Sequence, residues 1–178
     1  YSSAASDVYK RQVNDGAEFF NGETAVSGGT FEWLNSNDLD YTQTQKPKLT
    51  LSGGNLIVGN TGKLTIDNGG SISDTVSVDL NGDLILKENT TVNGNYSGTG
   101  NLTADDITLT VNGNNSGFNG NFIQNSGVTN VNNGASLFKN VSINDGELNF
   151  NSGSSVSSGT VFNSVNSTVS IISNSTCL

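Results

Sequence analysis

The sequence predicts an all-β protein whose short parallel strands coil into a β-helix, also called a β-solenoid. The clearest sign is residues 49–72, LTLSGGNLIVGNTGKLTIDNGGSI, where short alternating strands begin at Leu49, Leu56 and Leu64. A spacing of seven or eight residues is too short for helices and too regular for disorder. Two further signs are the Gly and Asn residues between the strands and the low content of large apolar residues.

The composition favours a repeated coil over an ordinary globule. Of 178 residues, enough for one domain, 33% are apolar and 13% are charged, while 22 are Gly, 28 Asn, 24 Ser and 18 Thr. A globule with so few large apolar side chains could not offset the entropy lost on ordering, whereas stacked coils pair their backbone groups and bury a narrow continuous core. Disordered chains share the polar composition but lack β-branched residues at a fixed period.

The strand period continues from Leu49 almost to the end of the chain. We expect strands at 49–51, 56–58, 64–66, 76–80, 84–86, 91–92, 102–103, 107–111, 122–123, 128–131, 136–138, 141–143, 148–150, 161–162 and 169–171, and around Val156. Successive residues of a strand point to opposite faces, so the apolar set lies inside and the Thr, Ser, Asn and Asp set lies outside.

Strand length and spacing select among three architectures. A membrane-spanning barrel needs strands of roughly 9–11 residues, and a sandwich has longer antiparallel strands with a turn every ~8–12 residues. A parallel β-helix uses three short strands per coil, so the spacing here gives a coil of roughly 22 residues and about seven coils. Gly and Asn suit its corners because both tolerate a left-handed backbone, and Asn side chains can stack from coil to coil.

Both ends of the chain differ from the repeat. Residues 1–12, YSSAASDVYKRQ, hold the only Arg and contain neither Gly nor Asn. They resemble a translated sequencing adapter of the kind found at the edges of reading frames assembled from environmental DNA, so we set them apart from the fold, with an irregular N-terminal arm as the alternative. Cys177 and Leu178 are open to the same interpretation. Residues 13–176 are then a single β-helix segment, expected to be an internal part of a longer protein.

The first part of this segment contains bulky residues and one irregular stretch. Phe19, Phe20, Phe31 and Trp33 are expected to fill a wider end of the core. At 35–48, NSNDLDYTQTQKPK, the strand period lapses around the only Pro of the chain. Loops carry function more often than the scaffold that positions them. This stretch is therefore a candidate interaction loop, and the residues singled out in it are Asp38, Asp40 and Tyr41.

Residues 98–150 contain a recurring set of short motifs. These are Gly98-Thr99-Gly100-Asn101-Leu102, the strand from Thr108 to Val111, Ser116-Gly117-Phe118-Asn119-Gly120 and Asn132-Asn133-Gly134. The segment resembles the repeats of autotransporter passenger domains and related large bacterial surface exoproteins. The resemblance extends over most of 49–171 and implies a right-handed β-helix that is exposed at the cell surface or secreted. It carries over no catalytic residue.

The residue types present exclude several kinds of site. Without any His, the chain has no Ser-His-Asp or Cys-His arrangement and no imidazole metal site. The formal net charge of −9 argues against nucleic acid and anionic lipid as partners, since both attract clustered Lys and Arg. No phosphate-binding Gly-rich loop with a following Lys-Ser/Thr occurs. We therefore expect no cofactor, no nucleic acid and no membrane insertion of this segment.

Asp83 and Asp105 form the one carboxylate pair whose spacing suggests chemistry. They lie 22 residues apart, so a coil of that length would stack them about 5 Å from each other, with Asp106 adjacent. Paired carboxylates at such a distance suit calcium binding or glycoside hydrolysis. Two solvated surface carboxylates are the plainer interpretation, because exposed Asp is the normal case.

Taken together, these observations predict a non-enzymatic stalk or adhesive surface on a bacterial protein that is secreted or attached to the outer membrane. Its partners would be host or cell-surface glycans or proteins, bound through weak contacts summed over many copies. The first alternative is a polysaccharide-active β-helix enzyme, a lyase or glycosidase, in which Asp83, Asp105 and Asp106 converge with a Lys in a groove. The second is a phage fibre-type structural repeat.

Overall fold

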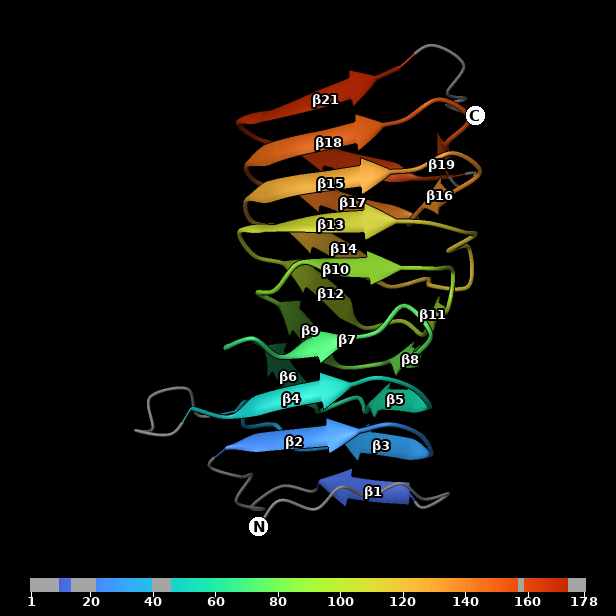
Figure 1. The fold of residues 1–178 in the computed structure, drawn as a ribbon. Coiled ribbons are helices and arrows are strands. Elements are labelled where there is room, and N and C mark those ends of the chain that lie inside the picture. Colours follow the sequence, from blue (N-terminus) through green and yellow to red (C-terminus); the bar gives the residue numbers. More distant parts are fainter. Residues whose placement is uncertain (1–9, 14–21, 40–45, 157–158, 173–178) are drawn as a thin grey trace.

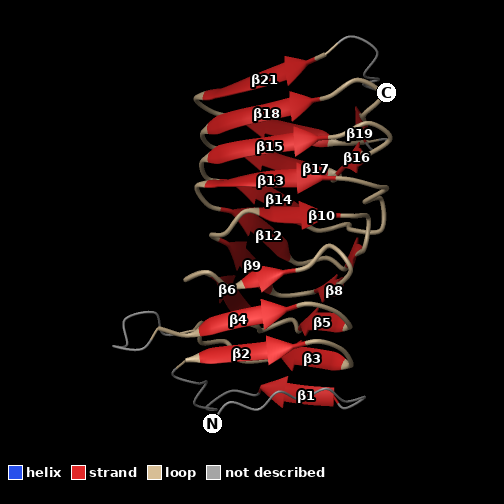
Figure 2. Ribbon diagram, in the orientation of Figure 1, coloured by secondary structure: helices blue, strands red, loops and turns tan. Residues whose placement is uncertain are grey.

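The computed structural model shows parallel strands stacked into a β-solenoid of about six turns (Figure 1). It describes residues 10–13, 22–39, 46–156 and 159–172. Within these ranges the chain contains strands and loops and no helix (Figure 2). The predicted all-β parallel solenoid is therefore confirmed at the level of fold class.

The strands of the stack form three faces. On the face turned to the front in Figure 1, two sheets stack in one column. The first sheet contains β2 (Glu23–Val26), β4 (Lys48–Leu51) and β7 (Ser71–Ile72), and the second contains β10 (Thr90–Val92), β13 (Ile107–Val111), β15 (Gly127–Val131), β18 (Gly146–Phe150) and β21 (Ser167–Ile171).

The remaining strands lie on the other two faces. The second face contains β1 (Lys10–Val13), β3 (Thr30–Trp33), β5 (Asn55–Val58), β8 (Ser77–Leu80) and β11 (Tyr96–Ser97), and later in the chain the short pair β16 (Ser136–Leu137) and β19 (Ser155–Val156) takes the same place in the coil. The third face contains β6 (Lys63–Ile66), β9 (Asp83–Leu86), β12 (Asn101–Ala104), β14 (Asn121–Gln124), β17 (Asn140–Ile143) and β20 (Val161–Ser164).

The core is a narrow column that runs along the inside of these faces. In β9, β12, β14 and β17, the residues Leu84, Leu102, Phe122 and Val141 share one register position, and none is more than 2% exposed. Alternation of apolar and polar residues places one such side chain inward at every second position. Since each inward position lies against the same position of the next coil, burial continues from coil to coil as a single cluster.

The coil length varies more than a fixed period predicts. Leu84 pairs with Leu102, which is one of the shortest steps, while Phe31 pairs with Leu56, which is one of the longest. The predicted coil of roughly 22 residues lies between these extremes, and that spacing occurs between Leu56 and Val78. Extra residues are taken up in the loops between faces, so the strand register is kept while the spacing changes.

A column of glycines lies where four strands of the third face begin. Gly62, Gly82, Gly100 and Gly120 each precede the first residue of β6, β9, β12 or β14. A Cβ atom on Gly100 would lie 2.1 Å from the carbonyl oxygen of Gly82, and one on Gly120 would lie 2.0 Å from that of Gly100. The sequence pattern predicts glycine at corners with a left-handed backbone. In this column glycine is needed for another reason, because the backbones of successive coils approach too closely for a side chain.

The strands predicted from Leu49 onward all have counterparts in the structure, shifted by one or two residues at their ends. The two-residue strands β7 and β11 were not among the predicted strands. Residues 10–12, set apart from the fold on sequence grounds, begin β1, which pairs with β3. They belong to the stack, and the adapter origin of residues 1–12 stays a prediction.

The aromatic residues expected in the core at the N-terminal end divide into two groups. Phe31 is fully buried and Trp33 is 1% exposed, with their ring centroids 6.3 Å apart. Both lie in β3 and point into the core, which confirms their predicted place. Phe19 and Phe20 lie outside the described residues.

Candidate functional site

The candidate interaction loop at 35–48 leaves the solenoid after β3, and Asp38 ties this first end to the next coil. Asp38 Oδ1 accepts a hydrogen bond from the backbone N–H of Thr65 at 2.7 Å, and its Oδ2 accepts one from the Thr65 hydroxyl. Leu39, which follows, is 5% exposed. Asp38 therefore anchors the loop to β6 instead of pointing freely toward a ligand.

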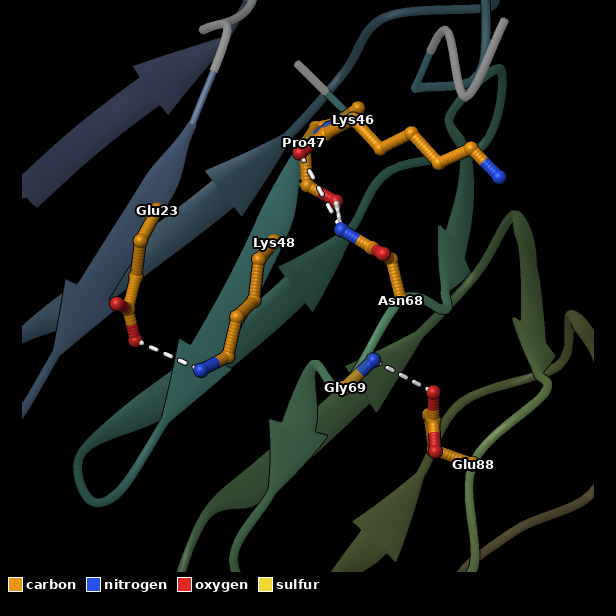
Figure 3. A network of polar contacts seen from close by, with 7 residues as sticks. All are labelled: Glu23, Lys46, Pro47, Lys48, Asn68, Gly69 and Glu88. Atoms are coloured by element: carbon orange, nitrogen blue, oxygen red, sulfur yellow. Dashed lines mark hydrogen bonds and ion pairs between the residues drawn. The ribbon is translucent and has the colours of Figure 1, made fainter. Parts of the chain in front are cut away.

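Asn68 ties the other end of the loop, in the turn that follows β6 (Figure 3). Its Nδ2 donates hydrogen bonds to the carbonyl oxygens of Lys46 at 3.3 Å and Pro47 at 3.4 Å. Asn68 has a φ of 56°, a left-handed conformation that Asn tolerates better than most residues. Both ends of the loop are thus held by the coil that follows it.

The polar network around this anchor extends to the neighbouring coils. Lys48 Nζ lies 3.1 Å from Glu23 Oε1 in the preceding coil, and the backbone N–H of Gly69 donates to Glu88 Oε1 at 2.6 Å (Figure 3). The ion pair is largely exposed, with side chains 37% and 58% accessible, so it contributes little to stability.

Asp40 and Tyr41, the other two residues singled out in this loop, lie outside the described residues. The coil that carries the loop is the longest by strand register in the described chain, since Thr24 pairs with Leu49 and Phe31 with Leu56. In the sequence, the extra length falls between Asp38 and Lys46, the residues at which the loop is held. The interaction role of Asp38, Asp40 and Tyr41 stays a prediction.

Asp83 and Asp105 belong to different columns of side chains and do not stack on each other. The strand register places Asp83 between Lys63 and Asn101. Asp105 Oδ2 lies instead 3.3 Å from Lys87 Nζ. The step from β9 to β12 is shorter than the average period. The residue of the next coil that pairs with Asp83 is therefore Asn101, which precedes Asp105 in the chain. Stacking of these two carboxylates was therefore a wrong inference from the period.

Asp106 does not join either carboxylate in a shared site. It is exposed and has a φ of 58°, in the turn between β12 and β13. Among the residues that the structure describes, no three Asp, Glu, Cys or His side chains are grouped as a metal ion would require. The three aspartates are distributed over separate positions on the outside of the coils.

Asp83 and Asp105 each begin a ladder of asparagine side chains that runs along the outside of the stack. Asn101 donates to Asp83 at 2.7 Å and Asn121 donates to Asn101 at 2.9 Å. A second ladder joins Asp105, Asn125 and Asn144 at 3.4 and 3.1 Å, and a third joins Asn112, Asn132 and Asn151 at 2.8 and 2.9 Å. The predicted stacking of Asn from coil to coil is confirmed.

All three ladders have the same direction, and a carboxylate stands at the start of two of them. In each hydrogen bond the amide Nδ2 belongs to the later coil and the acceptor oxygen belongs to the earlier one. An ionised carboxylate can only accept. Asp83 and Asp105 can therefore occupy only the first position of a ladder, and the lysine of the preceding coil, Lys63 or Lys87, lies on their other side.

A polar groove of about 490 Å³ crosses three successive coils at the short strands β16 and β19. Its lining consists of small polar residues, one lysine and one valine: Asn114, Ser116, Gly134, Ser136, Lys139, Ser155 and Val156. Amide and hydroxyl groups of this kind can both donate and accept hydrogen bonds. The groove offers a surface for a ligand rich in hydroxyl groups.

The wall of this groove is fixed by hydrogen bonds within the protein. The Ser136 hydroxyl donates to Asn114 Oδ1 at 3.0 Å and accepts from the backbone N–H of Asn115 at 3.1 Å. Asn115 is fully buried, and its Nδ2 donates to the Ser136 carbonyl oxygen at 3.2 Å. Ser136 is thus held in one orientation at the groove surface.

Lys139 supplies the positive charge of the groove. Its Nζ donates to Asn119 Oδ1 at 2.6 Å, which directs the ammonium group along the outside of the coil. This lysine was not among the residues singled out from the sequence. The sequence feature that could have identified Lys139 is its isolation, because it is the only charged residue between Asp106 and Asp145.

Tyr96 is a buried polar residue away from these surfaces. It is 3% exposed in β11, and its hydroxyl has no hydrogen-bond partner among the described residues. Burial raises the pKa of the Tyr96 phenol well above its ordinary value of 10.0, because the core does not solvate the charged form. The neutral, inward position indicates core packing and not proton transfer.

Comparisons with protein families, with curated proteins and with solved structures give no match to this chain. Within the described ranges, no helix has the length and apolar character needed to span a membrane. Indications of function therefore come from the fold, the anchored loop and the groove.

Proposed function

We propose that this chain is a non-catalytic scaffold, a right-handed β-helical segment of a bacterial surface-exposed or secreted autotransporter-like protein that serves as a stalk or adhesive surface. The right-handed sense, the location and about seven coils for residues 13–176 come from the sequence resemblance and period. The observation that supports the scaffold role is the use of Asp83 and Asp105 within coil-to-coil ladders instead of in a shared pocket.

The adhesive contacts in this proposal come from the groove and the anchored loop. The groove presents hydroxyl, amide and ammonium groups of Ser136, Asn114 and Lys139, which match the hydroxyl and carboxylate groups of surface glycans. A shallow site of this kind binds weakly on its own. Display of many copies on one cell converts weak contacts into stable attachment.

The glycosidase alternative requires two carboxylates that flank one sugar bond, roughly 5 to 9.5 Å apart. The lyase alternative requires Asp83, Asp105 and Asp106 to converge with a lysine in one groove. Asp83 and Asp105 each have an asparagine of the next coil as a hydrogen-bond partner, at 2.7 and 3.4 Å. A phage fibre-type repeat requires trimers, which sedimentation of the purified chain detects.

The test measures glycan binding and glycan cleavage on the same samples. Beads that display many copies of the chain are mixed with a panel of neutral and uronic acid-containing polysaccharides, and bound sugar and newly formed chain ends are measured. We expect retention without cleavage, and weaker retention for Lys139→Ala than for the control Lys63→Ala, which removes the same charge from β6. Release of oligosaccharides that depends on Asp83 or Asp105 would establish the enzyme instead. Absence of retention on every polysaccharide and on intact cells removes the adhesive role.

A further inference from the structure

Asn-Gly pairs are numerous in this chain, and their chemistry extends beyond the formation of turns. Six such pairs are described in full, those that begin at Asn68, Asn81, Asn93, Asn112, Asn119 and Asn133. In an Asn-Gly pair the backbone nitrogen of the glycine can attack Cγ of the asparagine, because glycine has no side chain to hinder the approach. Each pair is therefore a position at which the protein can change covalently without an enzyme.

Gly69 differs from the glycines of the other described pairs in the group that its N–H contacts. The backbone N–H of Gly69 donates to Glu88 Oε1 at 2.6 Å (Figure 3). The N–H of Gly82 donates instead to the carbonyl oxygen of Val58 at 3.1 Å. Among the residues that the structure describes, Gly69 is the one glycine of an Asn-Gly pair whose N–H donates to a carboxylate. A carboxylate at this distance is within reach of the proton that a general base would remove.

The Asn68 side chain and the Gly69 N–H point in different directions. Asn68 Nδ2 donates to the carbonyl oxygens of Lys46 and Pro47, whereas the Gly69 N–H is directed at Glu88 (Figure 3). Attack on Asn68 Cγ therefore requires this side chain to leave the two carbonyl oxygens and turn toward Gly69. Asn68 and Gly69 are both exposed, so water surrounds the reacting groups. The reaction thus begins while this end of the loop is detached from Asn68.

We propose that Asn68-Gly69 is a site of self-catalysed deamidation in which Glu88 is the general base. Glu88 accepts the proton of the Gly69 N–H as the nitrogen forms a bond to Asn68 Cγ. The bond from Cγ to Nδ2 then breaks, and the amide group takes this proton and leaves as ammonia. Water opens the resulting five-membered succinimide ring and gives aspartate or isoaspartate at position 68. One water is consumed and one ammonia is released, with no oxidation or reduction.

The product cannot restore the attachment of the loop end. An ionised carboxylate only accepts hydrogen bonds, so it cannot donate to the carbonyl oxygens of Lys46 and Pro47. The new charge also lies beside Asp67, whose Oδ1 accepts the backbone N–H of position 68 at 2.7 Å. A temporary detachment thereby becomes permanent. This inference is independent of the proposed scaffold role, because it concerns only how the loop end is attached.

The first experiment follows conversion of the full chain over time at neutral pH. Peptide mass spectrometry measures the increase of about 1 Da at each Asn-Gly pair and the isoaspartate content. We expect faster conversion at Asn68 than at Asn81, the internal reference, because the N–H of Gly82 is bound to a carbonyl oxygen and not to a carboxylate. In concentrated urea the two rates are expected to become similar, since the contact with Glu88 is lost.

Glu88→Gln tests the role of the carboxylate. The glutamine keeps an oxygen that can accept from the Gly69 N–H but is not a base, so conversion at Asn68 is expected to slow by at least about fivefold. Glu147→Gln is the matched control, because it removes the same charge from an exposed position of β18. Its conversion rate at Asn68 is expected to equal that of the natural chain.

Limited proteolysis of the same samples measures the attachment of the loop end. In the natural chain, cleavage near Lys46 is expected to rise in proportion to the fraction converted at Asn68. Asn68→Asp supplies the product directly and is expected to show the faster cleavage from the start. Asn133→Asp adds the same charge at another Asn-Gly pair, away from the loop, and is expected to leave cleavage unchanged. Circular dichroism verifies that both variants keep the β-sheet spectrum.

Three outcomes would overturn the proposal. Equal or slower conversion at Asn68 than at Asn81 in the folded chain means that the fold does not promote the reaction. Unchanged conversion in Glu88→Gln means that Glu88 is not the base. Conversion at Asn68 without faster cleavage near Lys46 means that this side chain does not hold the loop end.

Discussion

The coils from β9 to β18 and the coil that carries the loop at 35–48 are held together in different ways. In the first region the steps between paired strands are short and nearly equal, and the same contacts recur from coil to coil, namely the glycine column and the asparagine ladders. In the second the step is the longest of the described chain, and the coil is held by contacts that occur once, at Asp38 and Asn68.

The difference shows how a repeated fold can accommodate a special segment. Recurring contacts keep the stacked residues in register and leave room for differences of only one or two residues per coil, which the loops between faces take up. Contacts that occur once impose no such constraint. The coil with the loop at 35–48 can therefore contain extra residues between its attachment points to Thr65 and Asn68. A segment available for binding is expected in the second kind of coil.

The largest expected effect comes from Gly100→Ala in the glycine column. The new Cβ would lie 2.1 Å from the Gly82 carbonyl oxygen, so two coils must separate locally. We expect the free energy of unfolding to fall by at least about 3 kcal/mol, measured by urea unfolding. Gly28→Ala is the control, since nothing lies within 4 Å of a Cβ at that position. Equal stability of the two variants would show that the column tolerates side chains.

Asp38→Ala tests the anchor of the loop. The substitution removes both acceptors of the Thr65 backbone N–H and hydroxyl, and the expected loss is about 2 kcal/mol. Faster proteolysis near residue 39 is expected as well, because the loop loses one of its two attachments. Asn37→Ala, at an exposed neighbouring position, serves as the control. Unchanged proteolysis of the Asp38 variant would contradict the anchoring role.

Asn132→Asp tests the ladder with a minimal change of side chain. The carboxylate cannot donate to Asn112 Oδ1, so two acceptors face each other where a hydrogen bond of 2.8 Å existed. The expected loss is about 1.5 kcal/mol in urea unfolding. Asn133→Asp adds the same charge at the adjacent exposed position and is expected to have a smaller effect. The reverse order would mean that net charge, and not the ladder, governs stability.

Tyr96→Phe is expected to change stability least, and in the opposite direction. Removal of a buried hydroxyl that has no partner among the described residues is expected to stabilise the fold by about 1 kcal/mol. Since burial raises the pKa of Tyr96 in the folded state, only the unfolded chain loses this proton just above pH 10. Ionisation of Tyr96 therefore leaves the free energy of unfolding unchanged below pH 10 and lowers it by about 1.4 kcal/mol per pH unit above pH 10.

The measurement for Tyr96 is urea unfolding of both proteins at about pH 8 and about pH 11. The advantage of Tyr96→Phe over the natural residue is expected to grow between these two values. A constant difference would show that the Tyr96 hydroxyl ionises in the folded protein as easily as in the unfolded one.

The sequence predicted the structural features that repeat from coil to coil. Alternation in segments such as 107–111 located the strands, and the abundance of Asn anticipated the ladders. The period could not fix which residues stack, because loops between faces differ in length, and for this reason Asp83 met Asn101 and not Asp105. The anchors by Asp38 and Asn68 and the groove at Lys139 depend on side chains from different coils, far apart in the sequence, for which no local pattern exists.

The uniform direction of the asparagine ladders bears on how such a gene can change in length. Asn151 donates to Asn132 as Asn132 donates to Asn112, so in-frame deletion of residues 113–132 would bring Asn151 against an identical acceptor. Duplication of the same stretch would add one more matched step. A protein built in this way can be lengthened or shortened by whole coils through recombination, with the new junction already compatible on both sides.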